Sequence, residues 1–218
     1  MLPGLIASAV SLAVVAAILF GCAGGWDVPM FWVFLAVWIA AGVVSAWVID
    51  PDLIAERVLP GPGVRDGGWT ALFIPLALGQ FAVAGLDVGR FHWSDTVPLA
   101  VQVAGLVAMS AALAVAIWAS AVNRFFSSVI RIQTERGHRV VTSGPYRLVR
   151  HPAYAVAPFL LVGTGIALGS WLAATIGVLM LPLLLRRTVV EDRILREELP
   201  GYADYAARVR YRLVPGVW

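Results

Sequence analysis

Hydrophobic residues run along this chain in long unbroken blocks, and the polar residues gather in a few short segments between the blocks. Four windows carry no charged side chain, at residues 3–23, 28–49, 67–86 and 98–122. Each is close to the ~20 residues that an α-helix needs to cross a bilayer. The pattern predicts four membrane-spanning helices in this part of the chain.

A fifth apolar block, at residues 152–185, is too long for a single helix. Gly169, Ser170 and Trp171 interrupt it midway and predict a tight turn. We therefore expect a hairpin of two helices, each of about 17 residues and just long enough to span. With the four earlier windows, this makes about six spans.

Two polar segments predict smaller elements at the membrane surface. Residues 50–66 begin with a capping Asp-Pro pair and end in Pro and Gly, which predicts a short helix that would cover a cytosolic pocket. Residues 128–132 and 138–142 are rich in β-branched side chains and flank Gly137. This second pattern predicts a small β-hairpin.

The C-terminal region has the charge pattern of an amphipathic helix. It covers residues 186–210, with a break near Pro200 and Gly201. The predicted fold is therefore all-α: a polytopic membrane helix bundle with a small cytosolic β-hairpin and an amphipathic C-terminal helix. We expect one membrane domain over 1–218, in which 1–122 form a scaffold and 123–218 carry the chemistry.

Composition supports a membrane protein and predicts its orientation. Hydrophobic residues make up 60% of the chain and charged residues 13%, whereas about a quarter of an ordinary soluble domain is charged. There is no lysine, and 15 of the 16 arginines lie in residues 50–66, 123–151 and 186–218. The positive-inside rule places these segments and both termini in the cytosol. The arginine-only, alanine-rich composition favours a bacterial inner membrane.

The chain lacks the residue patterns that are typical of several classes of protein. No nucleophilic triad, Walker loop or dinucleotide fingerprint occurs, and the one cysteine, Cys22, has no metal-ligand spacing around it. We expect no metal, and since topology accounts for the basic charge, no nucleic-acid partner. The first four predicted spans hold no ionisable group deep inside them, which argues against an ion-coupled transporter.

The remaining polar chemistry forms two clusters at the ends of the predicted hairpin. One is at residues 144–154 and the other at 186–205. If the hairpin folds back, its two cytosolic ends become neighbours and the clusters form one site. Arg187 and Glu191 are four residues apart and so share a helix face, although an ordinary surface helix also carries such pairs.

These clusters resemble a known superfamily. The string Gly-Pro-Tyr-x-x-Val-Arg-His-Pro-x-Tyr at 144–154, the pair Glu191-Asp192 four residues after Arg187, and Tyr202-x-x-Tyr205 are similar to the isoprenylcysteine carboxyl methyltransferase and phospholipid methyltransferase superfamily. The resemblance covers roughly residues 123–218. It implies an integral membrane enzyme that uses S-adenosylmethionine and releases S-adenosylhomocysteine.

The resemblance also implies roles for individual residues. Arg187 and Glu191 would lie nearest the reacting groups, between the cofactor and the methyl acceptor. The chain departs from the family where Asp192 stands, since a second glutamate is frequent there. The residues implied to line or close the cofactor pocket are Tyr146, Arg150, His151, Pro152, Tyr154, Leu199, Tyr202 and Tyr205.

The expected function is therefore S-adenosylmethionine-dependent methyl transfer to a lipophilic, membrane-borne acceptor. The resemblance makes a prenylcysteine-like carboxylate the first candidate, and such an acceptor is ionised at neutral pH and needs no base. A phospholipid amine or a small thiol is the alternative, and Glu191 would then be the base. A non-catalytic membrane binding or assembly protein that kept the fold is the hypothesis from a different class.

Overall fold

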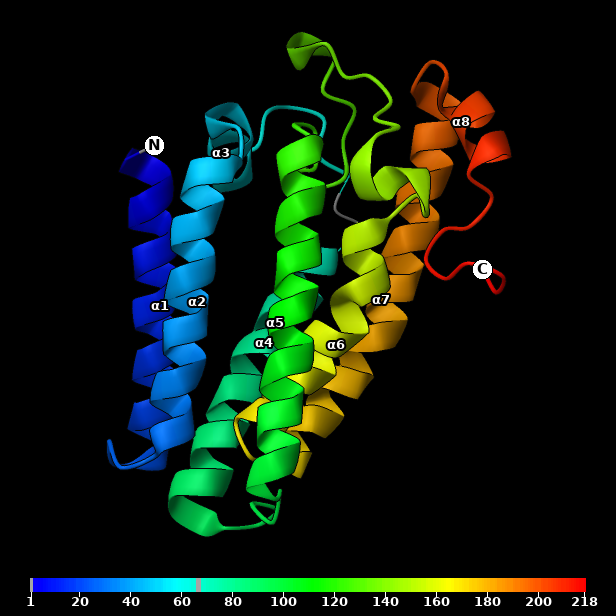
Figure 1. Ribbon diagram of the computed structural model, residues 1–218. Helices are drawn as coiled ribbons and strands as arrows, with labels where there is room; N and C mark the ends of the chain where they lie inside the picture. The colour runs from blue at the N-terminus through cyan, green and yellow to red at the C-terminus, as the bar shows by residue number, and fades with distance from the viewer. Residues whose placement is uncertain (1, 66–67) are drawn as a thin grey trace.

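The computed structural model describes residues 2–65 and 68–218, and every regular element in this part of the chain is helical (Figure 1). The long helices run side by side, up and down the molecule. They are α1 (Leu2–Ala23), α2 (Pro29–Val48), α4 (Trp69–Leu86), α5 (Leu99–Val122), α6 (Pro152–Ala167) and α7 (Trp171–Glu198). Two short helices, α3 (Pro51–Val58) and α8 (Tyr202–Arg208), lie at one end of the bundle (Figure 1).

The helices fall close to the predicted windows, but their lengths correct the number of spans. Four described helices are long and apolar enough to cross a membrane: Pro29–Val48, Trp69–Phe91, Leu99–Val122 and Trp171–Glu198. The apolar stretches Ser8–Ala23 and Pro152–Ala167 are shorter. The chain is thus a multi-pass membrane protein with four candidate spans, and the predicted count of six is not supported. The predicted start at residue 67 lies outside the described residues.

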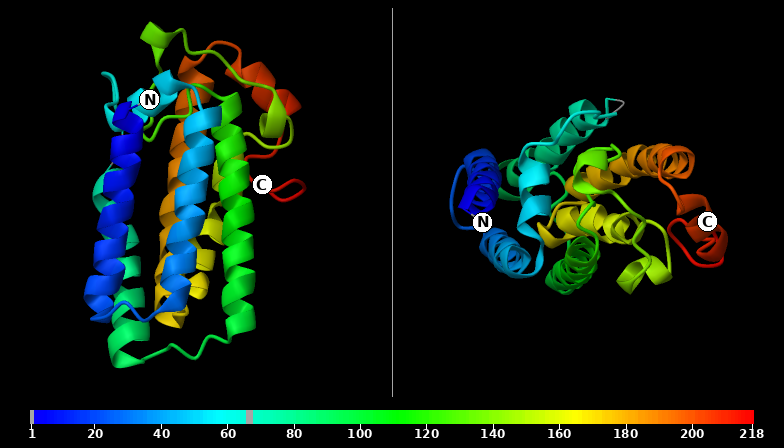
Figure 2. Two further views of the ribbon diagram at one scale, coloured as in Figure 1. Left: turned by 60° about the vertical axis from the view of Figure 1, so that its left-hand side comes forward. Right: turned by 90° about the horizontal axis from the view of Figure 1, so that it is seen from above.

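The long helices form a closed ring when the bundle is seen from above (Figure 2). Helix α1 packs against α2 and α4, and α4 packs against α7. Helices α6 and α7 pair with each other, and α5 lies between α6 and α2. This arrangement puts the beginning of α6 and the final turns of α7 at the same end of the molecule, next to the end of α5.

The predicted hairpin is present as α6 and α7. Gly169 turns the chain with φ +86°, and the Ser170 hydroxyl then caps α7 by accepting from the backbone N–H of Ala173 at 3.0 Å. The two helices touch through glycines: a Cβ on Gly165 would lie 2.1 Å from a backbone nitrogen of α7. The turn divides the apolar block near its middle, and α7 is longer than α6 because it continues beyond the block to Glu198.

The predicted β-hairpin is wrong, because residues 123–142 contain no strand. They form an irregular segment with a single 3₁₀ turn, η2 (Thr134–Arg136). The β-branched residues pack instead against neighbouring elements: Ile130 is buried, and Val140 and Val141 pack on a cluster of buried tyrosines. Strand propensity is mostly a preference for half-buried surfaces, and here the buried surface is not a sheet.

The helix predicted within 50–66 and the predicted amphipathic C-terminal helix are both present, with one difference. Helix α3 falls inside 50–66, and its Asp50 side chain caps it by accepting from Asp52 N–H at 2.9 Å. The amphipathic C-terminal helix has no separate beginning, since α7 runs unbroken from the apolar hairpin to Glu198. The break predicted near Gly201 is present, with φ +80° at that residue.

Candidate functional site

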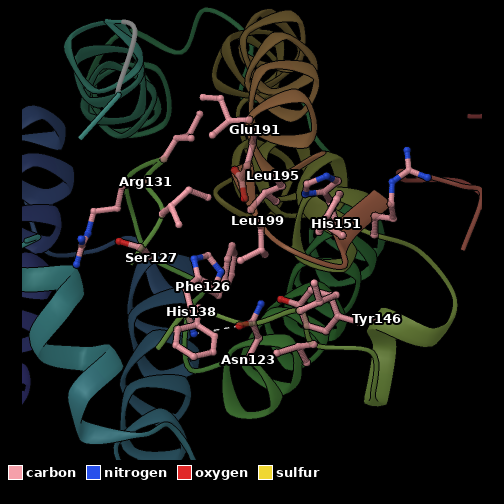
Figure 3. Close-up of a pocket in the computed structure, with 18 of the residues that line it drawn as sticks. Asn123, Phe126, Ser127, Arg131, His138, Tyr146, His151, Glu191, Leu195 and Leu199 are labelled. Atoms are coloured by element: carbon pink, nitrogen blue, oxygen red, sulfur yellow. Dashed lines mark hydrogen bonds between the residues drawn. The ribbon is translucent and has the colours of Figure 1, made fainter. Parts of the chain in front are cut away.

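A pocket opens where α5 ends, α6 begins and α7 leaves the bundle (Figure 3). The cavity left between these side chains is small, about 60 Å³, and it is partly open to solvent. All eight side chains expected to contact the cofactor line this pocket, and so does Glu191. Arg187 does not line it but reaches the wall through a hydrogen bond to Tyr154.

The first turn of α6 places the residues of the His-Pro-x-Tyr string. Pro152 occupies the first helical position, where its missing N–H costs nothing. His151 therefore sits at the helix entrance, and its ring lies nearly parallel to that of Tyr154, with centroids 5.7 Å apart. Both rings face the pocket because the helix begins at its edge.

Tyr154 stands between the two residues expected nearest the chemistry. Its hydroxyl accepts a hydrogen bond from Arg187 Nε at 2.7 Å and donates one to Glu191 Oε2 at 2.7 Å. Arg187 and Glu191 are themselves 3.9 Å apart. The three residues form one chain of hydrogen bonds, in which the phenol fixes both charged groups. Trp69 adds an aromatic face 5.0 Å from the Arg187 guanidinium.

Asp192, which the sequence named only as part of the motif pair with Glu191, is the buried centre of a second network. Its side chain is 1% exposed and takes a two-point contact from Arg150, with Nε to Oδ1 at 2.7 Å and Nη2 to Oδ2 at 3.2 Å. The other groups near this carboxylate are Arg212 at 3.0 Å, Arg196 and Tyr202 at 3.1 Å, and His151 at 3.4 Å.

This network engages Arg150 fully and ties the C-terminal tail to the site. The Arg150 guanidinium also donates to the carbonyls of Val209 and Arg210. The backbone N–H groups of Arg150 and His151 donate to the carbonyls of Tyr211 and Arg212, both at 3.0 Å. Arg150 is therefore a structural part of the pocket wall, because its guanidinium group is already hydrogen-bonded to protein groups.

The C-terminal side of the pocket is a cluster of buried tyrosines. Leu199, Tyr202 and Tyr205 pack together with Tyr146, and the Tyr205 hydroxyl donates to the Tyr146 carbonyl at 2.7 Å. Burial raises the pKa of Tyr146, Tyr202 and Tyr205 above the ordinary value for a phenol. These side chains thus present neutral aromatic faces to the pocket at any physiological pH.

The opposite wall comes from residues 123–141, and no motif in the sequence connects them with the pocket. Asn123, Phe126, Ser127, Arg131 and His138 are among its lining residues (Figure 3). Nothing in their spacing marks them as a site, because no regular element relates one to the next. Their polar character at the end of a predicted span was the one available signal.

His138 is held as a neutral imidazole in this wall. It stacks on Phe125 with centroids 4.7 Å apart, and its Nδ1 accepts from the Gln133 backbone N–H at 3.2 Å. Burial, together with the positive charges of Arg131 and Arg136, lowers the pKa of His138 to about 4. With Nδ1 acting as an acceptor, the ring proton is on Nε2.

The donors and faces of the pocket fit S-adenosylmethionine, which has an aromatic base, a cationic sulfonium and a carboxylate tail. Aromatic side chains can stack on the base and attract the sulfonium cation. For the tail, Arg139 lines the pocket, is exposed, and pairs with no carboxylate among the residues described. Within the described chain, no group of three His, Cys, Asp or Glu residues is arranged to hold a metal ion.

The fold and the site together define a multi-pass helical membrane protein with a small-molecule pocket at one end of its bundle. Comparison with known proteins is in agreement: residues 98–198 match the model of the isoprenylcysteine carboxyl methyltransferase family. A solved structure of the eukaryotic intramembrane Ras methyltransferase of this name superposes with a TM-score of 0.52 at 18% identity, covering 96% of this chain and 75% of that one. The resemblance expected from the motifs is thus confirmed, and the fold is shared.

Curated relatives match over shorter stretches. The cobalt-zinc-cadmium resistance protein CzcN of Cupriavidus metallidurans is 32% identical over 135 residues, which is 59% of this chain and 56% of that protein. A probable protein-S-isoprenylcysteine O-methyltransferase of Oryza sativa subsp. indica is 33% identical over 89 residues, 40% of this chain and 47% of the relative. The chain spans about half the length of the curated relatives it matches.

Proposed function

We propose that this protein is a membrane methyltransferase that uses S-adenosylmethionine and acts on a lipophilic acceptor. The observation that carries the proposal is the coincidence of two features at one end of the bundle. One is the aromatic pocket that gathers all eight motif residues, and the other is the Arg187–Tyr154–Glu191 chain beside it. The family match over residues 98–198 supports the same activity.

Within this proposal, residues 123–218 bind the cofactor and residues 1–122 act mainly as scaffold. The bound cofactor supplies an electrophilic methyl group on a positively charged sulfur. The faces of Tyr154, Tyr202 and Tyr205 stabilise a cation next to them, by roughly 0.5–2 kcal/mol each. His151 and Arg139 are placed to meet the carboxylate tail, since the guanidinium of Arg150 is engaged by Asp192.

On the acceptor side, the chain of hydrogen bonds holds two groups in fixed positions. Arg187 offers a planar cation that orients a carboxylate acceptor such as that of a prenylcysteine. Such an acceptor is already ionised at neutral pH, so the site has only to align it and exclude water. If the acceptor is a phospholipid amine or a thiol, Glu191 takes the proton as a general base.

An apolar groove supports the choice of a lipid-borne acceptor. It lies between α2 and α5 in the half of the bundle next to the pocket, and it encloses about 910 Å³ including open space. Its walls are apolar apart from Ser110, and Val44, Val48, Ile117 and Trp118 are among them. A hydrocarbon chain in the bilayer is the natural occupant of a groove with this lining.

We further propose that the site faces the cytosol of a bacterial cell, with the protein in the inner membrane. The supporting observation is that 15 of the 16 arginines lie in the segments at this end, and only Arg90 lies at the other. A cytosolic pocket also receives the soluble cofactor directly.

The direct test of the function is methyl transfer by the purified protein in lipid vesicles. Radiolabelled S-adenosylmethionine is offered with a prenylcysteine analogue, with phosphatidylethanolamine or with a small thiol. We expect label on the prenylcysteine carboxylate, and its loss in Arg187→Ala. Label on the amine or thiol alone would select the alternative acceptor, whereas a folded protein that labels none of them would favour the non-catalytic hypothesis.

A further inference from the structure

Helix α3 is attached to the pocket from outside. The family match begins at residue 98, so Pro51–Val58 lies beyond the matched region. None of its residues lines the pocket. Its side chains nevertheless bond to residues 120–131, which form or directly support the pocket wall opposite α6 and α7.

Glu56 makes the main attachment. Its side chain is 6% exposed and binds the Arg131 guanidinium at two points, with Oε1 to Nε at 2.7 Å and Oε2 to Nη2 at 2.8 Å. The Ser127 hydroxyl donates to Oε1 at 3.1 Å, and the Gly61 backbone N–H lies 3.4 Å from Oε2. A buried carboxylate with this many donors holds its partners in one geometry.

The partners of Glu56 are themselves lining residues. Arg131 and Ser127 both border the pocket, as does Phe126, the residue before Ser127. The Phe126 ring meets the Tyr154 ring edge-on, with centroids 6.1 Å apart. The wall segment that Glu56 binds is therefore in contact with Tyr154, the residue that links Arg187 to Glu191.

Arg57, the next residue on α3, makes a second attachment to the same wall. Its Nε donates to the Phe126 carbonyl at 3.0 Å, and its Nη2 donates to the Ser120 hydroxyl at 2.8 Å. The guanidinium also lies over the Phe126 ring, 5.0 Å from its centroid. Two consecutive residues of α3 thus hold the wall at its backbone and at its side chains.

The wall needs such support because it has no regular structure of its own between α5 and η2. Irregular segments with few internal hydrogen bonds open easily unless other elements hold them. We propose that Glu56 is a positioning residue, which acts through Arg131 and Ser127 to keep residues 123–131 in the shape that binds the cofactor. The inference rests on the proposed function, and it assigns the first half of the chain a part in cofactor binding.

Two measurements on the full-length protein in detergent test the inference. One is calorimetric titration with S-adenosylhomocysteine, and the other is hydrogen exchange of residues 123–131 without ligand. For Glu56→Ala we expect at least a tenfold rise in Kd and faster exchange in this segment. Glu56→Gln keeps the hydrogen-bonding shape without the charge and should give a smaller rise, about threefold.

Asp95→Ala is the control, because Asp95 pairs with His92 away from the pocket and its wall, at 2.6 Å. It should bind like the wild type. If Glu56→Ala does not fold, Glu56→Gln decides the question. Unchanged binding and unchanged exchange in a folded Glu56 variant would overturn the inference. If the wild type itself does not bind, the proposed function fails, and the exchange data still decide whether Glu56 holds the wall.

Discussion

At the scale of single residues, the Tyr154 hydroxyl bridges two charged groups, Arg187 and Glu191, which lie 3.9 Å apart. Arg187 and Glu191 share a helix face, and surface pairs of this kind usually contribute little to stability. Here the phenol lies between them and satisfies both, which leaves each charge fixed at a defined place beside the pocket.

Removal of this hydroxyl gives a first prediction. Tyr154→Phe keeps the aromatic face for the cofactor but removes one hydrogen bond from Arg187 and one from Glu191, while Arg187 keeps its bond to the Ser128 carbonyl. A hydrogen bond to a charged group is worth about 1.5–3 kcal/mol, so kcat should fall roughly 10- to 100-fold while the Kd for S-adenosylhomocysteine changes little. Steady-state kinetics beside Tyr211→Phe, whose hydroxyl has no described hydrogen bond, measure this. An unchanged kcat would contradict the role given to Tyr154.

His138 gives a prediction about pH. Its pKa is about 4 in the folded protein and ~6.5 in an unfolded chain. Between these values the unfolded chain binds a proton that the folded protein does not, so stability falls as pH is lowered from ~6.5 to ~4. Thermal unfolding across this range should show a steeper loss in the wild type than in His138→Gln. Identical slopes would mean that His138 is not buried as described.

For single residues, the sequence predicted the roles of those that belong to a short motif. It missed contacts between residues that are far apart in the sequence. The lining role of His151 and Tyr154 followed from a resemblance in one short string. The engagement of Arg150 by Asp192 did not, because the two residues are far apart in the sequence and meet only after the hairpin folds. The contribution of His138 was hidden for the same reason.

At the scale of elements, the α6–α7 hairpin depends on close contact between two helices. Backbones approach this closely only where small residues line the interface. A Cβ on Gly165 would lie 2.1 Å from Ala174 N, and a Cβ on Gly177 would lie 2.4 Å from Leu161 O. Because the partners are backbone atoms, no side chain can move aside to make room.

This contact predicts a large effect from one added side chain. Gly165→Val should lower the thermal unfolding midpoint strongly, by the equivalent of at least ~2 kcal/mol, since overpacking forces the helices apart. Gly42→Val on α2 is the matched control, because a Cβ on Gly42 would have no neighbouring atom within 4 Å. Equal midpoints for the two variants would show that the hairpin contact is looser than described.

The helices were predictable because charge-free windows of the right length leave the backbone no other solution in a bilayer. The segment 123–142 was not, because its β-branched residues indicate burial without saying what buries them. In the folded protein Ile132, Val140 and Val141 pack against the tyrosine cluster, and the Ile130 carbonyl accepts from Arg65 N–H at 2.9 Å. The sequence predicted that the runs 128–132 and 138–142 pair with each other, and in the folded protein neither forms a strand.

At the scale of the whole molecule, the ring of helices brings α3, the 123–141 segment and α8 to one end (Figure 1). The other end is fastened by Asp87, which is fully buried and accepts from Ser94 N–H at 2.6 Å and from the Ser170 hydroxyl at 2.5 Å. The molecule is therefore polar and open at one end and tied together at the other.

The orientation in the membrane is a prediction at this scale. In a Cys22→Ala background, Ser143→Cys and Asp27→Cys place single exposed thiols at the pocket end and at the opposite end. A membrane-impermeant maleimide applied to intact cells should label position 27 and spare position 143, because the arginine-rich end faces the cytosol. The reverse pattern would contradict the orientation and the cytosolic site.

Binding of S-adenosylhomocysteine is the measurement that tests the central claim most directly. Calorimetric titration of the detergent-purified protein should show saturable binding, and His151→Ala should abolish or strongly weaken it. His92→Ala, at an exposed histidine paired with Asp95 away from the pocket, should bind like the wild type. A folded wild-type protein that does not bind, or a His151→Ala variant that binds equally well, would contradict the assignment of this pocket to the cofactor.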